Sequence, residues 1–387
     1  MLQAKTGSST NKCAKTAGSE AARAAKEGMS GIKLAYAYAS CEYDLDAMLA
    51  GIADELPGVP VIGNTSFTGV ITPEGFITGE DGFLGIMTVA DEDMTVGVAS
   101  AEKTTCPVCA GEEVAKKAME AAGKTTPPDY FYMTAPSGEE EFFLKGITKV
   151  IGRVPFFGGT AADNTIEGNW KLYTDKGVFA DGVAVAFFYT DKPMKNKFTG
   201  AYHETTDMGV ITKIDGNRTL MEIDGVPALE KYAAWRGEDV SKFQGGALLA
   251  ETITSPLGVK DRLGDLVAIR HPMNGNEDGS MAIGNNLAVG TAVIRMEASV
   301  DELISSTGET LKELKSGMQA PGAFHLVHCG GRRAGIGDRI DEVAAQIKEA
   351  AGDVPFIVEF TFGEYGYEQD GLNTCGGLML SFTGFEQ

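Results

Sequence analysis

The stretch VPVIGNTSFTGV, from Val59 to Val70, decides how the chain is organised, because a very similar phrase recurs as VPFFGGTAADN from Val154 to Asn164. In both copies a short apolar run that begins with Val-Pro ends at a glycine and continues into small polar residues. An apolar run bounded by turn residues is typical of a buried strand that ends in a loop. The recurrence predicts that the chain repeats one structural unit.

The segments around the two phrases follow one order: a helix, a strand, a second helix, the phrase and a final strand. Corresponding positions lie about 95 residues apart, as Val59 and Val154 do. The matching segments are AGSEAARAAKE from Ala17 and AGEEVAKKAME from Ala110, IKLAYAYAS from Ile32 and DYFYMTAP from Asp129, DLDAMLAGIADEL from Asp44 and EEEFFLKGITKVI from Glu139, and EDGFLGIMTV from Glu80 and ADGVAVAFFY from Ala180. A shared order over so many segments indicates a duplication.

The C-terminal half carries a looser copy, in which VPFIVEFTFGEYG, Val354 to Gly366, takes the place of the phrase. The accompanying segments predict strands and helices in alternation: GTAVIRMEAS from Gly290, SVDELISSTGETLKELKSG from Ser299, AFHLVHCGG from Ala323, DRIDEVAAQIKEA from Asp338 and GLMLSF from Gly377. Several strands are joined by short turns, which favours mixed or antiparallel sheets. We therefore predict an α/β fold with helices flanking internally duplicated sheets, in two similar halves, residues 1–197 and 198–387.

The composition excludes several classes of function. The chain has 387 residues, a formal net charge of -21 and a hydrophobic fraction of 43%. Such a negative charge repels nucleic-acid phosphates and anionic lipid. The sequence contains no run of about 18 apolar residues, so it predicts no membrane helix. The first residues lack the apolar region of a secretory signal. We expect a cytoplasmic globular protein that binds neither nucleic acid nor a membrane.

Among the six cysteines, Cys106 and Cys109 form the CPVC motif, which has the spacing of a metal or redox site. A structural zinc ion needs a second pair of ligands, and the sequence contains no second CxxC. The alternative is that both are ordinary loop thiols. We predict no metal site from the sequence.

Two turns that follow the repeated phrase are candidates for ligand contact. Glycine permits a close approach of the backbone, and hydroxyl and free N–H groups can bind a carboxylate. The candidate residues are Gly63, Thr65 and Ser66 in the first turn and Gly159, Thr160 and Asn164 in the second. The alternative is that both are ordinary strand-end turns.

Two segments of the C-terminal half place charged groups at predicted strand ends. In CGGRRAGIG, Cys329 to Gly337, Arg332 or Arg333 could bind an anion beside the start of a helix. In TFGEYG, Glu364 lies between glycines, where a carboxylate could hold an amine. The alternatives are surface arginines and a solvated loop acid.

Taken in their joint order, these motifs resemble the FIST family, a two-part sensory module of signal transduction. The resemblance covers almost the whole chain. It is carried in the first part by Gly7-Ser8-Ser9-Thr10, VIGNTSFTGVI, FFGGTAADN and DGVAVAFF, and in the second by GVITKIDGNRTLMEIDGVPALEKY, PLGV, EDGSMAIGNNLAVGTAVIRM, HCGGRR and FTFGEYG.

The resemblance implies a small-ligand sensor, with an amino acid as the leading suggestion. By position it points to Gly63, Thr65, Gly159, Thr160, Cys329, Arg332 and Glu364. Near the end, GLNTCGGL departs from a His-Asn-Gln-Thr-like phrase of many members, which leaves Asn373 and Thr374 as the match. The output of such a sensor would pass to a separate signalling partner, such as a histidine kinase.

Three hypotheses about function follow. In the first, a small polar ligand binds with its carboxylate at Arg332 and its amine at Glu364. In the second, suggested by haem-based nitric-oxide sensors among similar proteins, one of His203, His271, His325 and His328 or a cysteine holds a haem. In the third, nearby arginines lower the pKa of Cys329 and make it the nucleophile of an enzyme. We favour a sensor that is not an enzyme and needs no cofactor.

Overall fold

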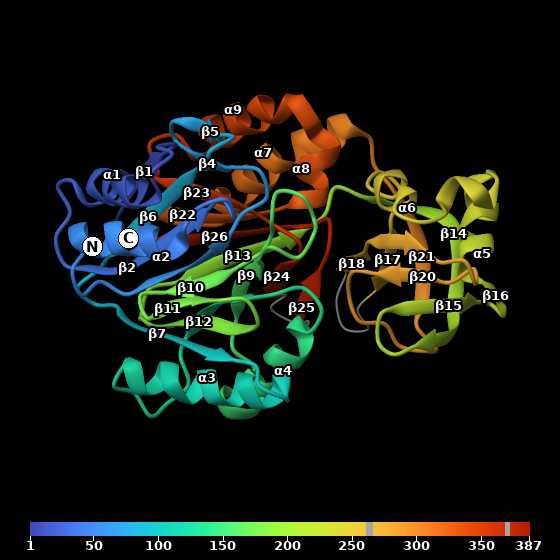
Figure 1. The fold of residues 1–387 in the computed structure, drawn as a ribbon, viewed down its shortest axis with the longest axis horizontal. Coiled ribbons are helices and arrows are strands. Elements are labelled where there is room, and N and C mark those ends of the chain that lie inside the picture. The colour runs from blue at the N-terminus through green and yellow to red at the C-terminus, as the bar shows by residue number, and fades with distance from the viewer. Residues whose placement is uncertain (261–265, 368–371) are drawn as a thin grey trace.

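The computed structural model describes residues 1–260, 266–367 and 372–387. It contains three six-stranded mixed sheets, which together form one body, and a separate antiparallel sheet. In Figure 1 this body occupies the left and centre, while the smaller antiparallel domain lies at the right. Within the described ranges, no helix has both the length and the apolar character needed to cross a bilayer.

The first unit of the body consists of eight elements. They are β1 (Gln3–Ser9), α1 (Ala14–Lys26), β2 (Ile32–Ala39), α2 (Leu45–Glu55), β3 (Val61–Thr65), β4 (Val70–Thr72), β5 (Gly75–Ile77) and β6 (Leu84–Ala90). The five that the sequence predicts, α1, β2, α2, β3 and β6, follow the predicted order. The repeated phrase forms β3 and the loop that follows it. The alanines of α1 are buried against the sheet and α2, and their small side chains let the helix pack closely against both.

The second unit repeats this order element by element. It consists of β7 (Thr95–Glu102), α3 (Pro107–Ala121), β8 (Tyr130–Ala135), α4 (Glu140–Ile151), β9 (Phe156–Thr160), β10 (Leu172–Thr174), β11 (Gly177–Phe179) and β12 (Gly182–Tyr189). The duplication predicted from the sequence is thereby confirmed.

A third unit begins at β13 (Met194–Thr199) and resumes a hundred residues later at α7 (Val300–Ser316). Its other elements are β22 (Pro321–Cys329), α8 (Gly330–Ile336), η2 (Gly337–Arg339), α9 (Ile340–Ala351), β23 (Phe356–Thr361), β24 (Glu364–Tyr367), β25 (Asn373–Gly376) and β26 (Leu380–Glu386). The looser C-terminal copy is therefore a full third repeat. The predicted boundary between residues 197 and 198 falls inside β13.

The residues between β13 and α7 form the inserted domain, which interrupts the third unit. Its elements are β14 (His203–Asp215), β15 (Thr219–Ile223), β16 (Val226–Pro227), α5 (Ala228–Arg236), η1 (Val240–Phe243), α6 (Ala247–Glu251), β17 (Leu257–Lys260), β18 (Val267–Arg270), β19 (Pro272–Gly275), β20 (Met281–Ile283) and β21 (Ala292–Glu297). A separate cluster of buried side chains, around Leu229 and Tyr232, forms its core.

Each sheet contains four strands of one unit and a hairpin from another unit. The order of the four main strands is the same in all three sheets: β1-β6-β2-β3, β7-β12-β8-β9 and β13-β26-β22-β23. The fifth and sixth strands come from another unit, because β10-β11 extends the first sheet, β24-β25 the second and β4-β5 the third. The exchange binds the three units into one body.

Equivalent backbone hydrogen bonds close this arrangement into a ring. One N–H···O bond links each strand-end loop to the next unit: Phe67 to Phe360, Ala162 to Thr65, and Phe362 to Thr160. Each bond is between 2.9 and 3.0 Å long. The three units are therefore arranged cyclically, with their strand-end loops gathered at one place.

Three equivalent side chains meet at the centre of the body. Tyr36, Tyr132 and His325 occupy the same position in β2, β8 and β22, each paired with the parallel strand that follows it. The centroids of these three rings lie 4.7 to 5.4 Å from one another. Glu359 lies beside them and accepts hydrogen bonds from Tyr132 and Asn64. Burial raises the pKa of Glu359 to about 8 and lowers that of His325 to about 3, so burial favours the neutral form of both groups.

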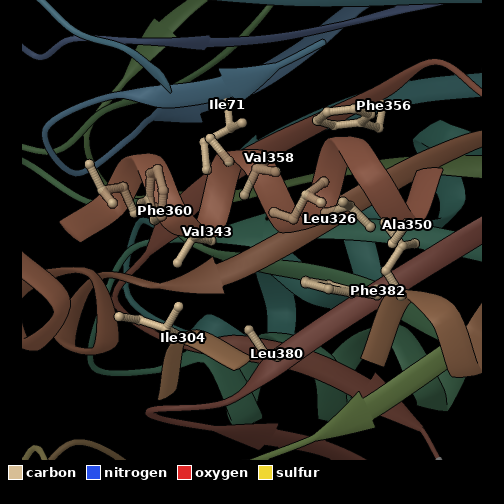
Figure 2. Close-up of a cluster of buried hydrophobic side chains, with 14 of the residues drawn as sticks. Ile71, Ile304, Leu326, Val343, Ala350, Phe356, Val358, Phe360, Leu380 and Phe382 are labelled. Carbon is tan, nitrogen blue, oxygen red and sulfur yellow. The ribbon is translucent and has the colours of Figure 1, made fainter. Parts of the chain in front are cut away.

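The outer side of the third sheet packs against α7 and α9 through a continuous apolar cluster. Figure 2 shows Leu326, Val358 and Phe382 of the sheet facing Ile304 and Val343 of these helices. The mixed α/β class with helices flanking the sheets is thus confirmed. Each unit buries one helical layer, and the three sheets bury one another at the centre.

Candidate functional site

The glycines of the repeated phrase are packing positions. A Cβ atom on Gly63 would lie 1.7 Å from the carbonyl oxygen of Ala37, and one on Gly159 would lie 2.5 Å from a methyl group of Thr361. Glycine is needed because neighbouring strands and side chains fill the space. The ligand contact predicted for Gly63 and Gly159 therefore has no open surface at these positions.

The hydroxyl groups of the first turn are used within the protein. Thr65 is fully buried, and its Oγ1 accepts a hydrogen bond from the N–H of Lys171 at 2.9 Å. Ser66 donates to the carbonyl oxygen of Gly69 at 2.7 Å and accepts from the N–H of Phe360 at 2.9 Å. Both residues tie the first unit to its neighbours.

The second turn makes equivalent internal contacts. Thr160 is fully buried, with its hydroxyl 3.1 Å from the Glu140 carboxylate and 2.8 Å from the Tyr365 hydroxyl. Asn164 donates to Ser40 Oγ at 3.2 Å and accepts the N–H of Thr68 at 3.0 Å. Asn164 thus connects the loops of the first and second units.

Arg332 is completely buried and lies against α7. Its Nη2 donates to the carbonyl oxygen of Leu303 at 2.8 Å and to Ser306 Oγ at 2.7 Å, while Nε and Nη1 have no partner within the described ranges. The sequence predicted an arginine beside a loop. The structure instead turns it inward, because Arg332 projects from a different face of α8 than Gly331 and Ala334.

Glu364 is also completely buried, at the start of β24. Its carboxylate accepts the N–H of Met379 at 2.8 Å and the hydroxyl of Thr361 at 3.0 Å. Burial raises its pKa to about 8, and these hydrogen bonds oppose the shift. Asn373, on the adjacent β25, donates to the carbonyl oxygen of Val154 at 2.8 Å. Both residues are built into the second sheet.

A pocket of about 170 Å³ lies where the inserted domain meets the strand-end loops of the second and third units. The body contributes Ser137, Ile166, Trp170, Cys329, Gly330, Gly331, Ala334, Phe362, Gly377 and Leu378. The inserted domain contributes Leu249, His271, Met273, Gly284 and Asn285. Of the ten predicted ligand residues, Cys329 is among those that line this pocket.

Buried and exposed residues divide the pocket into a base and a mouth. His271, Asn285, Cys329 and Leu378 are buried, whereas Ser137, Ile166 and Ala334 are exposed. Apolar and aromatic side chains form most of the wall, and no Asp, Glu, Lys or Arg side chain of the described residues lines it. Such a wall favours a compact ligand with an apolar body and few polar groups.

The loop that carries Ile166 and Trp170 is fixed by one buried carboxylate. Asp163 accepts backbone N–H groups from five successive residues, among them Gly168 and Asn169 at 2.7 Å each. These bonds hold Ile166 at a φ of 62°, a conformation that is strained for a β-branched residue. Strain of this kind is retained where the surroundings dictate a loop shape, and it clusters at ligand sites.

Cys329 and Leu378 form the deep part of the wall. Sγ of Cys329 accepts the N–H groups of Leu378 at 3.2 Å and of Gly331 at 3.3 Å. Leu378 has a φ of 55°, so a second strained residue lines the same pocket. The sulfur atom therefore serves as an internal acceptor that fixes the turn around Leu378.

The pKa of Cys329 is raised, chiefly by burial and further by Glu364. The hypothesis of an activated thiol requires the opposite direction, because the thiolate is the nucleophile. The guanidinium of Arg332 does little to lower the pKa of Cys329, because it points toward α7. The structure thus contradicts the expected lowering of the pKa of Cys329.

Two polar side chains of the inserted domain line the base of the pocket. His271 bonds through Nε2 to the carbonyl oxygen of Leu249 at 3.1 Å, and burial lowers its pKa to about 4, so it is neutral at pH 7. Because a carbonyl only accepts, Nε2 carries the proton and Nδ1 is an acceptor. Asn285 is 2% exposed, and its Oδ1 has no partner among the described residues. An unpartnered buried amide is costly, which points to a bound partner.

The residues present do not fit a haem. The pocket of about 170 Å³ is smaller than the roughly 300–1,000 Å³ that larger cofactor-sized ligands occupy. His325 and His328 are fully buried among core side chains, and His203 pairs with Glu302 at the surface. Within the described ranges, no group of three or more His, Cys, Asp or Glu side chains is arranged to hold a metal ion.

Arg218 attaches the inserted domain to the body next to the pocket. Its Nη2 pairs with both Glu140, at the start of α4, and Glu141, the latter at 2.7 Å. The same guanidinium donates through Nη1 to the carbonyl oxygen of Gly284 at 2.7 Å. The N–H of Asn286 also donates to Glu141 at 3.0 Å. The turn that presents Asn285 is thereby connected to the body.

Sequence reasoning missed Asn285, Trp170, Phe362 and Leu378, and it considered His271 as a haem ligand alone. The turn-rich stretch around Asn285 carries no local sign of a ligand site, and its contact with the body depends on long-range packing. The strain at Leu378 has no local signal, because leucine rarely adopts a positive φ. Asp163, within the repeated phrase, was the clue available, since aspartate commonly caps turns.

Comparison with known proteins adds weak structural likenesses. A cyanuric acid hydrolase from A. caulinodans aligns with a TM-score of 0.36 and 10% identity over 100% of both chains. T. maritima PurL complexed with AMPPCP aligns with a TM-score of 0.25 and 10% identity over 100% of this chain and 72% of that one. These scores carry no argument about this chain. Among curated proteins, no significant match is found.

Family models give a clear result. The FIST N domain matches residues 33–226, from β2 to the β14–β16 hairpins, and the FIST C domain matches residues 228–367. The two matches meet inside the inserted domain and together span most of the chain, in the order that the motifs predicted. The chain belongs to the FIST family, whose domains are sensory domains of signal transduction.

Proposed function

We propose that the protein senses a small molecule that binds in the pocket between the inserted domain and the body. The observation that carries the proposal is the buried amide of Asn285 at the base of this pocket, whose Oδ1 lacks a partner in the part of the chain that the structure describes. Two residues with strained backbone, Ile166 and Leu378, line the same pocket. Preformed walls with few polar groups are typical of small-molecule sites.

The pocket's volume and lining restrict the ligand's chemistry. A cavity of about 150 Å³ is known to bind benzene, so about 170 Å³ suits a molecule of similar size. A charged group without a partner in such a site would cost several kcal/mol, on the order of a buried unpaired ion. We infer an uncharged ligand with an apolar body and a donor group for Asn285.

An amino acid is the second candidate, and Arg332 is the observation that favours it. Its Nε and Nη1 atoms lack partners among the described residues, so a carboxylate that reached them would gain hydrogen bonds. Glu364 would then be the partner for the amine. Neither residue is among those that line the pocket, so this binding mode requires Arg332 to give up its hydrogen bonds to α7.

Ligand binding would change how the inserted domain is held against the body. Asn285 is adjacent to Asn286, whose N–H bonds to Glu141, and Arg218 bridges the same region. A ligand that bonds Asn285 would stabilise the arrangement in which the inserted domain is held against the body, and would shift the population toward that arrangement. We propose that a separate signalling protein, such as a histidine kinase, recognises this arrangement in the cytoplasm.

A thermal-shift and calorimetry screen tests the proposal. The panel consists of uncharged molecules of about benzene size and the amino acids. We expect protection by uncharged members, which Ala334→Trp at the mouth abolishes and Ala53→Trp on the exposed face of α2 leaves intact. Protection by amino acids that is lost in Arg332→Lys and Glu364→Gln would support the second candidate. Equal protection in the Ala334→Trp and Ala53→Trp variants would exclude this pocket.

A further inference from the structure

The CPVC motif lies at the start of α3, away from the residues that line the pocket. Cys106 is the residue that precedes the helix, Pro107 is its first residue, and Cys109 follows in the first turn. The Cα atoms of Cys106 and Cys109 are 5.2 Å apart, within the range that a disulfide bond allows, and the two sulfur atoms are bonded. A disulfide between residues three apart encloses a small loop.

The two sulfur atoms have different surroundings. Cys109 is exposed, whereas Cys106 is half-buried. Sγ of Cys106 accepts the backbone N–H of Cys109 at 3.1 Å, at the N-terminus of a 15-residue helix. Negative charge is stabilised at a helix N-terminus, and cysteines there are better thiolates than free cysteine. Cys106 is therefore the better leaving group and Cys109 the more accessible sulfur atom.

A zinc site at this pair is not supported, because two further ligands are needed. Within the described ranges, no third histidine, cysteine or acidic side chain joins the two cysteines in a metal-binding group. Cys13, Cys41, Cys329 and Cys375 are free thiols, none of them paired with this motif. The chemistry left to the motif is that of its own sulfur atoms.

We propose that Cys106 and Cys109 form a thiol–disulfide exchange site for low-molecular-weight thiols. A thiolate attacks Sγ of Cys109, the Cys106–Cys109 bond breaks, and its electron pair leaves on Cys106 as a thiolate. A second thiol then attacks the bound thiol's sulfur atom and releases Cys109. In total the protein disulfide gains two electrons and two protons, and two thiols become one disulfide. This redox input is independent of the ligand pocket.

Glutathione is the probe that tests this proposal. In a Cys13→Ser, Cys41→Ser background, the full chain is equilibrated in reduced and oxidised glutathione, alkylated and weighed by mass spectrometry. We expect one two-electron transition at Cys106 and Cys109. With Cys106→Ser added, oxidised glutathione should leave one glutathione on Cys109. With Cys109→Ser added, Cys106 should be alkylated with a pKa below the roughly 8.5 of free cysteine.

Two results would overturn the proposal. One is that both thiols stay reduced in excess oxidised glutathione. The other is that the two single variants form the same amount of mixed disulfide and their thiols titrate alike, since the exchange depends on the asymmetry of the pair. Thermal unfolding of each variant serves as the folding control. The exposed N-cap thiol of Cys13, restored in the Cys106→Ser, Cys109→Ser chain, serves as the control for a helix N-terminal cysteine that has no partner thiol.

Discussion

Arg218 of the inserted domain and Glu141 of the second unit form an ion pair, with 2.7 Å between Nη2 and Oε2. Glu140, which shares the same guanidinium, is almost completely buried, and burial raises its pKa. The guanidinium of Arg218 thus holds the inserted domain against the body and also balances the charge of the buried Glu140. This contact lies at the edge of the proposed ligand pocket, because Arg218 also bonds the carbonyl oxygen of Gly284.

Replacement of Arg218 should loosen the inserted domain. Arg218→Ala leaves Glu140 without its partner and removes the bond to Gly284. We expect a loss of about 2–3 kcal/mol in the free energy of unfolding, somewhat below the roughly 3–5 kcal/mol for breaking a fully buried pair, because Arg218 is 18% exposed. Hydrogen exchange should rise in the turn around Asn285. Arg218→Lys should retain part of the stability, and unchanged exchange in Arg218→Ala would contradict the role of this contact.

The loop held by Asp163 should depend on its carboxylate. Asp163→Ala removes the shared acceptor of five part-buried N–H groups, so we expect a loss of about 2–4 kcal/mol in the free energy of unfolding. Asp163→Asn should lose less, since one oxygen acceptor stays. The matched control is Thr165→Ala, which keeps its backbone N–H and should change stability by less than about 0.5 kcal/mol. Urea unfolding measures all three, and equal losses for Ala and Asn would oppose the account.

A residue that relieves the backbone strain at Ile166 should stabilise the protein. Ile166→Asn suits a φ of 62° better, so we expect a gain of about 1 kcal/mol in the free energy of unfolding. The same change removes an apolar wall of the pocket and should weaken ligand binding. Thr68→Asn is the matched control, because Thr68 has a φ of 59° and does not line the pocket. It should stabilise the chain without a change in binding.

Buried Glu364 should make the protein less stable as the pH rises. Its pKa is about 8 in the folded chain and lower when unfolded, so the folded state binds more protons between these values. The contribution is full at acid pH and is lost as the pH rises toward 8. His271, with a pKa of about 4, has the opposite slope only below its unfolded pKa of about 6.5.

The window from pH 6.5 to 8 therefore isolates the carboxyl groups. Glu364→Gln keeps the shape without the proton, so its free energy of unfolding should fall less steeply than that of the native chain. The difference should be up to about 1.4 kcal/mol per pH unit. Glu359, whose pKa is also about 8, adds a similar slope, and Glu359→Gln gives an independent comparison. A slope that stays the same in Glu364→Gln would contradict a buried neutral carboxyl group.

The sequence predicted the repeats because Val-Pro and the following glycine recur at Val59 and Val154. It did not predict the exchange of hairpins, since a turn signal fixes neither the sheet nor the strand that a hairpin joins. The direction of Arg332 was missed for a related reason. Its position beside glycines suggested an open loop, whereas the short helix α8 faces Gly331 and Ala334 to the pocket and Arg332 to α7.

The pocket was beyond sequence reasoning because its two sides are far apart in the chain. Asn285 comes from the inserted domain and Cys329 from the third unit, and only the folded arrangement brings them to one wall. The hydroxyl groups of Thr65 and Thr160 looked available for a ligand. In the fold they satisfy neighbouring groups of the protein, since the three units crowd their strand ends together.

Calorimetric titration with phenol and toluene tests whether an uncharged molecule binds at Asn285. The two molecules have nearly the same shape, but only phenol carries a donor for Oδ1. We predict that the native chain binds phenol about 5–30-fold more tightly, the value of one hydrogen bond to an otherwise unpartnered buried group. Asn285→Ala should abolish this preference while toluene binding persists. Equal binding of both molecules to the native chain, or an unchanged preference in Asn285→Ala, would contradict the account.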